Sequence, residues 1–353
     1  MNESDTSFDY LIMTFIAKSL LPPTPSAADL LRMYKLPALR KFAQNFLLDP
    51  KATSKLVACA GKIENHFVIE VGPGPGGITR QLFAQGAAKV AAIEKDVRLF
   101  PALQILADAV EQRLKLYLDD ILTFPIESVI SEEYARPWTD EKLPPIDIIG
   151  NLPFNISLPL LVQWIKQTST QTGPFKFGRI PITITLQEEV GGRLVADALM
   201  LQRGRLSILC QNWFNIKVKH IFSGRAFVPA AKINVAVMQL VPLIKPLVDV
   251  SYNRLDELTK LAFHTRNKPI GQTLALLFPL ETRSENADEL LSRAKLDSKS
   301  HALTLTVEEW GLLAQIYSDI IVRPRPEHEK IFQKTTHELT FKLGETFINS
   351  NSI

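Results

Sequence analysis

Acidic side chains are missing from one long stretch of this chain. There is no Asp or Glu between Ala198 and Val248, although the 353 residues include 37 acidic ones. The stretch does contain the cations Arg203, Arg205, Lys217, Lys219, Arg225, Lys232 and Lys245. A surface of one charge sign can bind a polyanion. Solvated lysines on exposed strands and turns would give the same pattern, so charge alone leaves both interpretations open.

Cysteine is scarce as well. The chain has two cysteines, Cys59 and Cys210, far apart and without His or Cys partners at metal-binding spacing. A disulfide scaffold and a zinc site are therefore not expected, no metal site is predicted, and a reducing compartment is favoured.

Long apolar runs are also absent. No segment approaches the roughly 18 apolar residues that a membrane helix requires, so we expect a soluble protein that does not bind membranes. A hydrophobic fraction of 46% with 22% charged residues is typical of a globular protein. The length of 353 residues allows a full α/β domain and a smaller second domain.

The middle of the chain alternates short apolar, β-branched runs with helix-like segments, which predicts a largely parallel sheet covered on both faces. Residues 214–222 and 233–242 are strand-like with no helix between them, so we expect an antiparallel pair at one sheet edge. After Val248 the segments have helical periodicity and predict a small helical domain. The predicted parts are an N-terminal extension with a candidate targeting segment (1–30), a catalytic domain (31–248), a helical domain (249–325) and a poorly ordered polar tail (326–353).

The N-terminal region leaves the compartment open. Residues 1–13 contain Asp and Glu and do not resemble an import signal, whereas the segment from Met13 places Lys and Arg on apolar repeats with one acidic residue. That second pattern is weakly like an amphipathic transit segment. Whether Met1 or Met13 starts the protein is not decided by composition.

A glycine-rich turn follows the first predicted strand, in "VIEVGPGPGGITR" (residues 68–80). Gly72 and Gly74 let the backbone turn sharply and approach a ligand, and the next helix presents free N–H groups. A nucleotide, S-adenosylmethionine or a mere tight turn all fit this motif alone.

Carboxylates end the next two predicted strands. Glu94 ends one strand and can accept hydrogen bonds from a ribose diol. Asp120 ends the other and can accept from the exocyclic amine of adenine. An ordinary strand-end carboxylate is the default for either residue alone. Since the carboxyl ends of parallel strands meet at one edge, glycines, Glu and Asp together favour an adenosine ligand.

The segment Asn151-Leu152-Pro153-Phe154 follows the fourth strand at the same edge. If the substrate is an exocyclic amine on a base, its lone pair is delocalised and weakly nucleophilic. The Asn151 side-chain oxygen and the Leu152 carbonyl could accept hydrogen bonds from the N–H groups of this amine. They would thereby localise its lone pair toward a methyl donor. Pro153 stiffens the turn and Phe154 offers a flat face for stacking. A β-turn with a core Phe is the structural alternative.

A second ring, Phe227, lies in "GRAFVPAAKINV" within the acid-free stretch. It could sandwich the target base with Phe154, although a ring in this context is more often part of the core.

No strong general base is needed, because a methylated, positively charged amine loses its proton readily.

Together these motifs resemble the ribosomal RNA adenine N6-dimethyltransferases, the KsgA/Dim1 family, and most closely its mitochondrial branch. The resemblance runs from about residue 21 to about residue 325 and includes "QNFLLD", "EVGPGPGGITR", "AIEKD", "DDIL", "IGNLPFNIS", "LQEEVGGRL", "RGRLS" and "FVPAAKINV". It implies an α/β fold, a class I Rossmann-like methyltransferase sheet with a small C-terminal helical domain, and S-adenosylmethionine as cofactor.

The resemblance also implies roles for individual residues. Those matching cofactor-binding positions are Gln44, Asn45, Leu47, Gly72, Gly74, Glu94, Lys95, Asp120, Ile121 and Asn151. The residues expected at the methylation site are Asn151, Leu152, Pro153 and Phe154. RNA contacts are expected from Arg203, Arg205, Arg225, Lys232, Arg266 and Lys268.

The implied substrates are two adjacent adenosines in the 3′-terminal hairpin of the mitochondrial small-subunit rRNA, each dimethylated at N6. The implied partner is a small ribosomal subunit precursor in the mitochondrial matrix, bound by a monomer. RNA loops suit such chemistry because their bases can be splayed into a pocket. A contact with mitochondrial RNA polymerase is left open.

The chain departs from the family pattern in two places. Ala231 stands where the family's "FxPxPxV" has its second proline, and the basic cluster of the helical domain is reduced to Arg266 and Lys268. These changes bear on RNA affinity more than on chemistry.

Other functions were weighed against this one. A non-enzymatic transcription factor or assembly scaffold would be favoured by degraded glycines or by loss of Asn151, and neither is seen. A DNA adenine methyltransferase would need a larger recognition domain than the helical segment provides. An NAD-dependent oxidoreductase leaves "NLPF" without a role.

Overall fold

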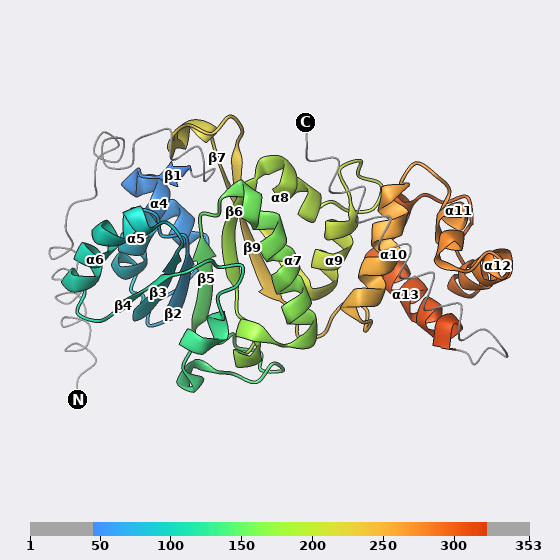
Figure 1. Cartoon of the computed structure of the whole chain (residues 1–353), viewed down its shortest axis with the longest axis horizontal. Helices are drawn as coiled ribbons and strands as arrows, with labels where there is room; N and C mark the ends of the chain where they lie inside the picture. The colour runs from blue at the N-terminus through green and yellow to red at the C-terminus, as the bar shows by residue number, and fades with distance from the viewer. Residues whose placement is uncertain (1–44, 323–353) are drawn as a thin grey trace.

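A seven-stranded mixed sheet forms the centre of the molecule in the computed structural model, which describes residues 45–322 (Figure 1). The strand order is β4-β3-β2-β5-β6-β9-β7. The strands are β2 (Phe67–Val71), β3 (Lys89–Glu94), β4 (Leu114–Leu118), β5 (Ile146–Gly150), β6 (Ile182–Gln187), β7 (Phe214–Phe222) and β9 (Val235–Pro242). The segments predicted for the N-terminal extension and the polar tail lie outside the described residues.

The five strands from β2 to β6 pair in parallel, as the alternating sequence pattern predicts. Every residue of β2 and β5 is buried, which is typical of strands covered on both faces. Because β2 lies between β3 and β5, their carboxyl ends lie side by side at one edge of the sheet. That edge holds the loops that carry the candidate site.

Helices cover both faces of the sheet (Figure 1). On one face α4 (Pro50–Ala58) and α5 (Gly77–Ala84) pack over β2 and β3, and α6 (Phe100–Ala109) adds Leu106 to the same apolar cluster. On the other face α7 (Phe154–Thr170) and α9 (Arg205–Trp213) pack over β5 and β6. The short α8 (Glu188–Leu194) begins directly after β6.

The predicted antiparallel edge pair is confirmed. β9 pairs antiparallel with β6 and with β7, so β7 is an edge strand of the sheet. The pairing of β7 contains a bulge between Val218 and His220, where the register with β9 shifts by one residue.

A second, two-stranded sheet lies beside the carboxyl edge. β1 (Phe46–Leu47) pairs antiparallel with β8 (Phe227–Val228), and Leu47 is opposite Phe227. This pairing joins the segment before α4 to the turn that follows β7.

The expected helices after residue 248 are present. They are α10 (Tyr252–His264), α11 (Ile270–Leu274), α12 (Arg283–Ala294) and α13 (Val307–Val322). Their apolar faces belong to the same cluster of buried residues as α7 and α9, so they pack directly onto the sheet's helical layer. The domain boundaries stay predictions. No helix of the described residues is long and apolar enough to cross a membrane.

Candidate active site

A cavity of about 160 Å³ opens at the carboxyl ends of β2, β3, β4 and β5. Its lining includes the ends of four successive strands and the segment just before α4. The lining residues that the sequence singled out are Asn45, Gly72, Glu94, Lys95, Asp120, Ile121, Asn151 and Pro153. The structure therefore brings most of the predicted cofactor positions into one cavity. Gln44 lies outside the described residues.

The glycine-rich turn between β2 and α5 forms one wall of this site. Gly72 and Gly74 adopt positive φ angles of 67° and 59°, which favour glycine over other residues. A Cβ atom on Gly74 would come within 2.8 Å of the Phe46 ring. The turn thus needs glycine at this position both for its backbone conformation and for its close contact with β1.

Glu94 fastens this turn to the end of β3. Its carboxylate accepts hydrogen bonds from the N–H groups of Gly74 at 3.1 Å and Asp96 at 2.8 Å. The side chain is buried, and this burial raises its pKa above the usual range, while the two N–H donors act in the opposite direction. Each oxygen that accepts one of these bonds has a second lone pair, which a ribose hydroxyl could use.

Asp120 lies beyond β4 and carries a negative charge into the cavity. It accepts a hydrogen bond from Lys95 Nζ at 2.6 Å and one from the N–H of Leu122 at 3.0 Å. The Lys95 hydrogen bond is the main cause that lowers the pKa of Asp120. Lys95 therefore holds this carboxylate in its ionised, accepting form, and the next residue, Ile121, is buried against the core.

The Asn151 side chain is held at both ends of its amide. Its Nδ2 donates to the Asn45 carbonyl at 2.8 Å, and its Oδ1 accepts from the Thr185 hydroxyl at 2.8 Å. An amide oxygen has two acceptor positions, so Oδ1 retains one for a substrate N–H. The two hydrogen bonds together fix the orientation of the Asn151 amide at the edge of the cavity.

Thr185 is a functional candidate that sequence reasoning missed. It lies in the middle of β6 and is fully buried. Its hydroxyl accepts from the Leu152 N–H at 3.1 Å while it donates to Asn151. One hydroxyl thus positions both residues proposed to accept from the target amine. A β-branched residue inside an apolar strand gives no sequence signal for this role.

The two aromatic rings of the predicted base sandwich differ in burial. Phe154 begins α7 next to Pro153 and is partly buried, packed at the margin of one core cluster. Phe227 is 2% exposed, and its ring packs edge-on against Phe222 with centroids 6.3 Å apart. This burial fits the core alternative, and base stacking by Phe227 stays a prediction. Stacking by Phe154 stays a prediction.

The predicted RNA contacts fall into two groups. Arg225, Lys232, Arg266 and Lys268 are exposed. Arg203 is 3% exposed, and Arg205 forms an ion pair with Asp256 of α10. Arg205 contacts α10 and Arg203 lies near acids of α13, so both arginines serve the interface with the terminal helices, and their RNA contacts stay predictions.

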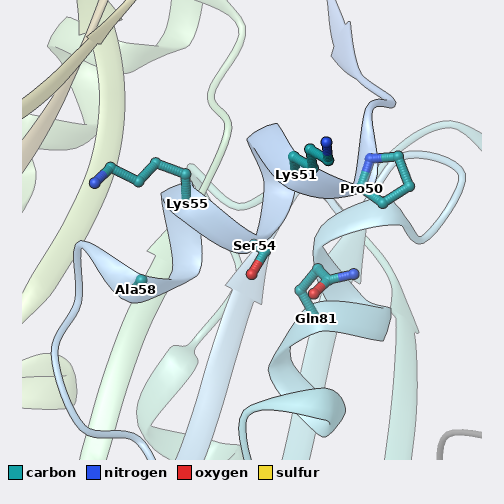
Figure 2. A pocket seen from close by; sticks show the side chains of 6 residues that line it. All are labelled: Pro50, Lys51, Ser54, Lys55, Ala58 and Gln81. Atoms are coloured by element: carbon teal, nitrogen blue, oxygen red, sulfur yellow. The ribbon is translucent and has the colours of Figure 1, made fainter.

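A second hollow lies on the outer side of α4 (Figure 2). It is wider, about 510 Å³, and is lined by Pro50, Lys51, Ser54, Lys55, Ala58 and Gln81. Its cations extend in different directions in Figure 2 and no residue of the glycine turn borders it, so it does not resemble a cofactor cavity. No group of three or more His, Cys, Asp or Glu side chains suited to a metal ion occurs among residues 45–322.

The residues of the 160 Å³ cavity fit S-adenosylmethionine. Gly72 and Gly74 allow close approach of a ligand to the backbone, Glu94 supplies acceptors for a ribose, and Asp120 supplies an ionised acceptor for an adenine amine. The parallel sheet, the glycine turn after β2 and these strand-end acids define the class: an S-adenosylmethionine-dependent class I methyltransferase.

Comparison with known proteins places the chain within that class. A family model described as ribosomal RNA adenine dimethylase matches residues 37–312, which is most of the chain, and the chain belongs to this family. It is 39% identical to "Dimethyladenosine transferase 1, mitochondrial" of Homo sapiens over 84% of this chain and 86% of that protein. It is 37% identical to the Caenorhabditis elegans protein of the same name over 86% of this chain and 84% of that protein. The prediction of the mitochondrial branch is confirmed.

Solved structures agree on the fold. The crystal structure of a dimethyladenosine transferase from Plasmodium falciparum matches with a TM-score of 0.62 and 18% identity, covering 78% of this chain and 98% of that one. The 23S rRNA methyltransferase ErmE matches with a TM-score of 0.54 and 21% identity, covering 78% of this chain and all of that one. The predicted fold class is confirmed.

Proposed function

We propose that this protein transfers methyl groups to N6 of two adjacent adenosines in the 3′-terminal hairpin loop of mitochondrial small-subunit rRNA, within a small ribosomal subunit precursor. The observation that carries the chemistry is the hydrogen-bonded set Asn45–Asn151–Thr185 beside the glycine turn. A binding scaffold has no need of an amide oxygen fixed in this way, so the non-enzymatic alternative is not favoured.

S-adenosylmethionine, when bound, supplies the activated methyl group. The chain's own residues prepare the acceptor. Asn151 Oδ1 and the Leu152 carbonyl accept hydrogen bonds from the two N–H groups of the adenine amine. These hydrogen bonds localise the nitrogen lone pair toward the methyl donor. After the first transfer the cationic amine loses a proton to water, and its one remaining N–H donates to one of the two acceptors during the second transfer. The second proton is also lost to water. Pro153 is the N-cap residue of α7, and its ring restricts the backbone that carries this pair of acceptors.

The Asn151→Ala variant tests this role of the site. Loss of the amide removes one acceptor and the contact to Asn45, so we expect methyl transfer to fall at least about 100-fold. Binding of S-adenosylmethionine should weaken, and the melting temperature should change little because the side chain is only partly buried. Transfer is measured with labelled cofactor and an rRNA hairpin.

Asn253→Ala is the matched control, since Asn253 is exposed on α10 away from the cavity. It should leave transfer and cofactor binding unchanged. Full activity of Asn151→Ala would refute the proposed mechanism.

A further inference from the structure

Six exposed cations on three neighbouring segments have no ion-pair partner among residues 45–322. We refer to them as the α4–β7 face: Lys51 and Lys55 on α4, Lys217 and Lys219 on β7, and Arg225 and Lys232 in the turn after β7. The proposed site uses none of the four lysines on α4 and β7. What such a face could bind depends on whether these segments form one surface.

Contacts through β9 join α4 to β7. The Gln239 side chain donates to the carbonyl of Ala60, just past the end of α4, at 2.9 Å. Gln239 pairs with Lys217 in the sheet, and directly paired residues place their side chains on the same face. Lys217 therefore lies on the α4 side of the sheet. Burial raises the pKa of the Cys59 thiol, and the charges of Lys55 and Lys219 both act to lower it. These two cations therefore lie within electrostatic range of the same thiol.

The turn after β7 lies against the start of α4. Leu47 pairs with Phe227, so the turn that carries Arg225 lies beside the segment that leads into α4. The N–H of Ala231 donates to the Gly224 carbonyl at 2.9 Å, which brings Lys232 close to Arg225. Figure 1 shows the far end of β7 beside β1 and α4. The three segments thus form one surface.

Two carboxylates next to these segments form no ion pair with these cations among residues 45–322. Asp49 is the N-cap of α4, where it accepts from the N–H of Ala52, and Glu188 accepts from Asn234. The interface around Arg203 differs, because Asp197, Glu308 and Glu309 lie close enough to act on its charge. Cations without an ion-pair partner among residues 45–322 are thus grouped on the α4–β7 face, whereas Arg203 near the terminal helices lies among acids.

The shape of the face favours an extended anion. The hollow along α4 is broad and open, and Lys51 and Lys55 lead away from the helix in different directions (Figure 2). Two cations that diverge do not enclose a single phosphate. They suit a series of phosphates spaced along a chain, as in a nucleic-acid backbone, where each neutralised phosphate adds to affinity by releasing counterions.

We infer that the α4–β7 face binds the phosphate backbone of the substrate RNA beside the loop that enters the active site. The face borders the cavity, because Asn45 contacts Asn151 and leads through β1 into α4. The terminal helices α10–α13 lie at the other end of the molecule from α4 (Figure 1). The inference rests on the proposed function in that the substrate is an RNA hairpin.

The test replaces Lys51, Lys55, Lys217 and Lys219 with Gln in the full chain and measures equilibrium binding of the rRNA hairpin over a range of salt. Loss of four phosphate contacts should lower the slope of log K against log salt by about 3 and weaken binding at least tenfold at low salt. Binding of S-adenosylmethionine and the melting temperature should match the wild type, because all four side chains are exposed. The control variant, Lys115→Gln with Lys166→Gln, removes exposed charges from the opposite edge strand and from α7 and should retain the wild-type slope.

Each outcome has a definite meaning. An unchanged slope in the four-lysine variant overturns the inference while methylation by the wild type upholds the proposed function. A lysine-dependent slope without any methylation upholds the face and contradicts the proposed function. Equal loss in the control variant shows a non-specific charge effect and overturns the inference. Binding that depends on the four lysines with vesicles of phosphatidylcholine and phosphatidylglycerol, but not with RNA, assigns the face to a lipid surface instead.

Discussion

Two buried polar side chains near the site, Thr185 and Glu70, differ in whether they form hydrogen bonds. Thr185 satisfies its hydrogen-bonding capacity with Asn151 and Leu152, whereas both carboxylate oxygens of the fully buried Glu70 lack a hydrogen bond of ordinary geometry. Buried polar groups usually find partners. The Thr185 hydroxyl is therefore fixed by two residues of the proposed methylation site, whereas the protonation state of Glu70 is set by its burial.

Replacing Thr185 with Val tests the positioning of Asn151. Valine has nearly the same shape but removes the hydroxyl, so Asn151 loses its donor and the Leu152 N–H loses its acceptor. We expect kcat to fall at least about tenfold, since loss of one such hydrogen bond to the reacting geometry costs about 1–3 kcal/mol. The measurement is steady-state transfer to the hairpin.

Thr183→Val is the matched control on the same strand, because the buried Thr183 hydroxyl has no hydrogen-bond partner among the described residues. It should keep full activity. Thr185→Ser restores a hydroxyl and should recover activity. A Thr185→Val enzyme as fast as wild type would show that Asn151 does not need this donor.

Glu70 gives a prediction for pH. Burial raises its pKa to about 8, with the Glu94 charge adding to the shift and Thr79 hydrogen bonding opposing it. The folded state then holds a proton that the unfolded chain, with an ordinary carboxyl pKa near 4.5, has released. Stability from this group is complete below pH 4.5 and is lost as pH rises through about 8. Chemical unfolding from about pH 5 to about pH 9 should show this decline, and Glu70→Gln should flatten it.

Glu132→Gln serves as the comparison, because Glu132 is exposed in the loop before β5. It should retain the wild-type pH profile. If Glu70→Gln declines as steeply as the wild type, Glu70 is not the titrating group.

At the scale of elements, the glycine turn and β1 depend on each other. The Phe46 ring packs against Gly74, and the same two-residue strand pairs with β8. The parallel strands were predictable because their short apolar, β-branched runs alternate with helical segments, and the antiparallel edge pair because two strand-like runs follow each other with no helix between them. The β1–β8 pair was not, because two residues carry no period. The sequence did not reveal that this pair buries Phe227, and the base sandwich stays a prediction.

Gly74→Ala tests the fit of the turn. An alanine at φ 59° adopts a left-handed conformation that costs about 1–2 kcal/mol, and its Cβ would lie 2.8 Å from the Phe46 ring. We expect lower stability by about that amount and weaker binding of S-adenosylmethionine, measured by unfolding and by calorimetry. Gly192→Ala is the control, since nothing lies within 4 Å of its Cβ position in α8. Unaltered cofactor binding by Gly74→Ala would contradict the placement of the cofactor at this turn.

At the scale of the whole molecule, the acid-free stretch does two different things. Its first part holds the terminal helices: Arg205 pairs with Asp256, and Arg203 is buried near acids of α13. Its later part carries exposed cations on β7 and in the turn that follows, namely Lys217, Lys219, Arg225 and Lys232. The sequence predicted the charge but not this division, because burial and pairing across 50 residues depend on how the helices pack. The motif residues of the cavity were predictable because strand ends in a parallel sheet converge.

The central claim is tested most directly by incubating the purified protein with labelled S-adenosylmethionine and the mitochondrial small-subunit rRNA hairpin, followed by digestion and identification of the modified nucleoside. We predict N6,N6-dimethyladenosine at two neighbouring positions. A protein that binds the cofactor and the hairpin but leaves the adenosines unmodified, both in free RNA and in small-subunit precursors, would contradict the account.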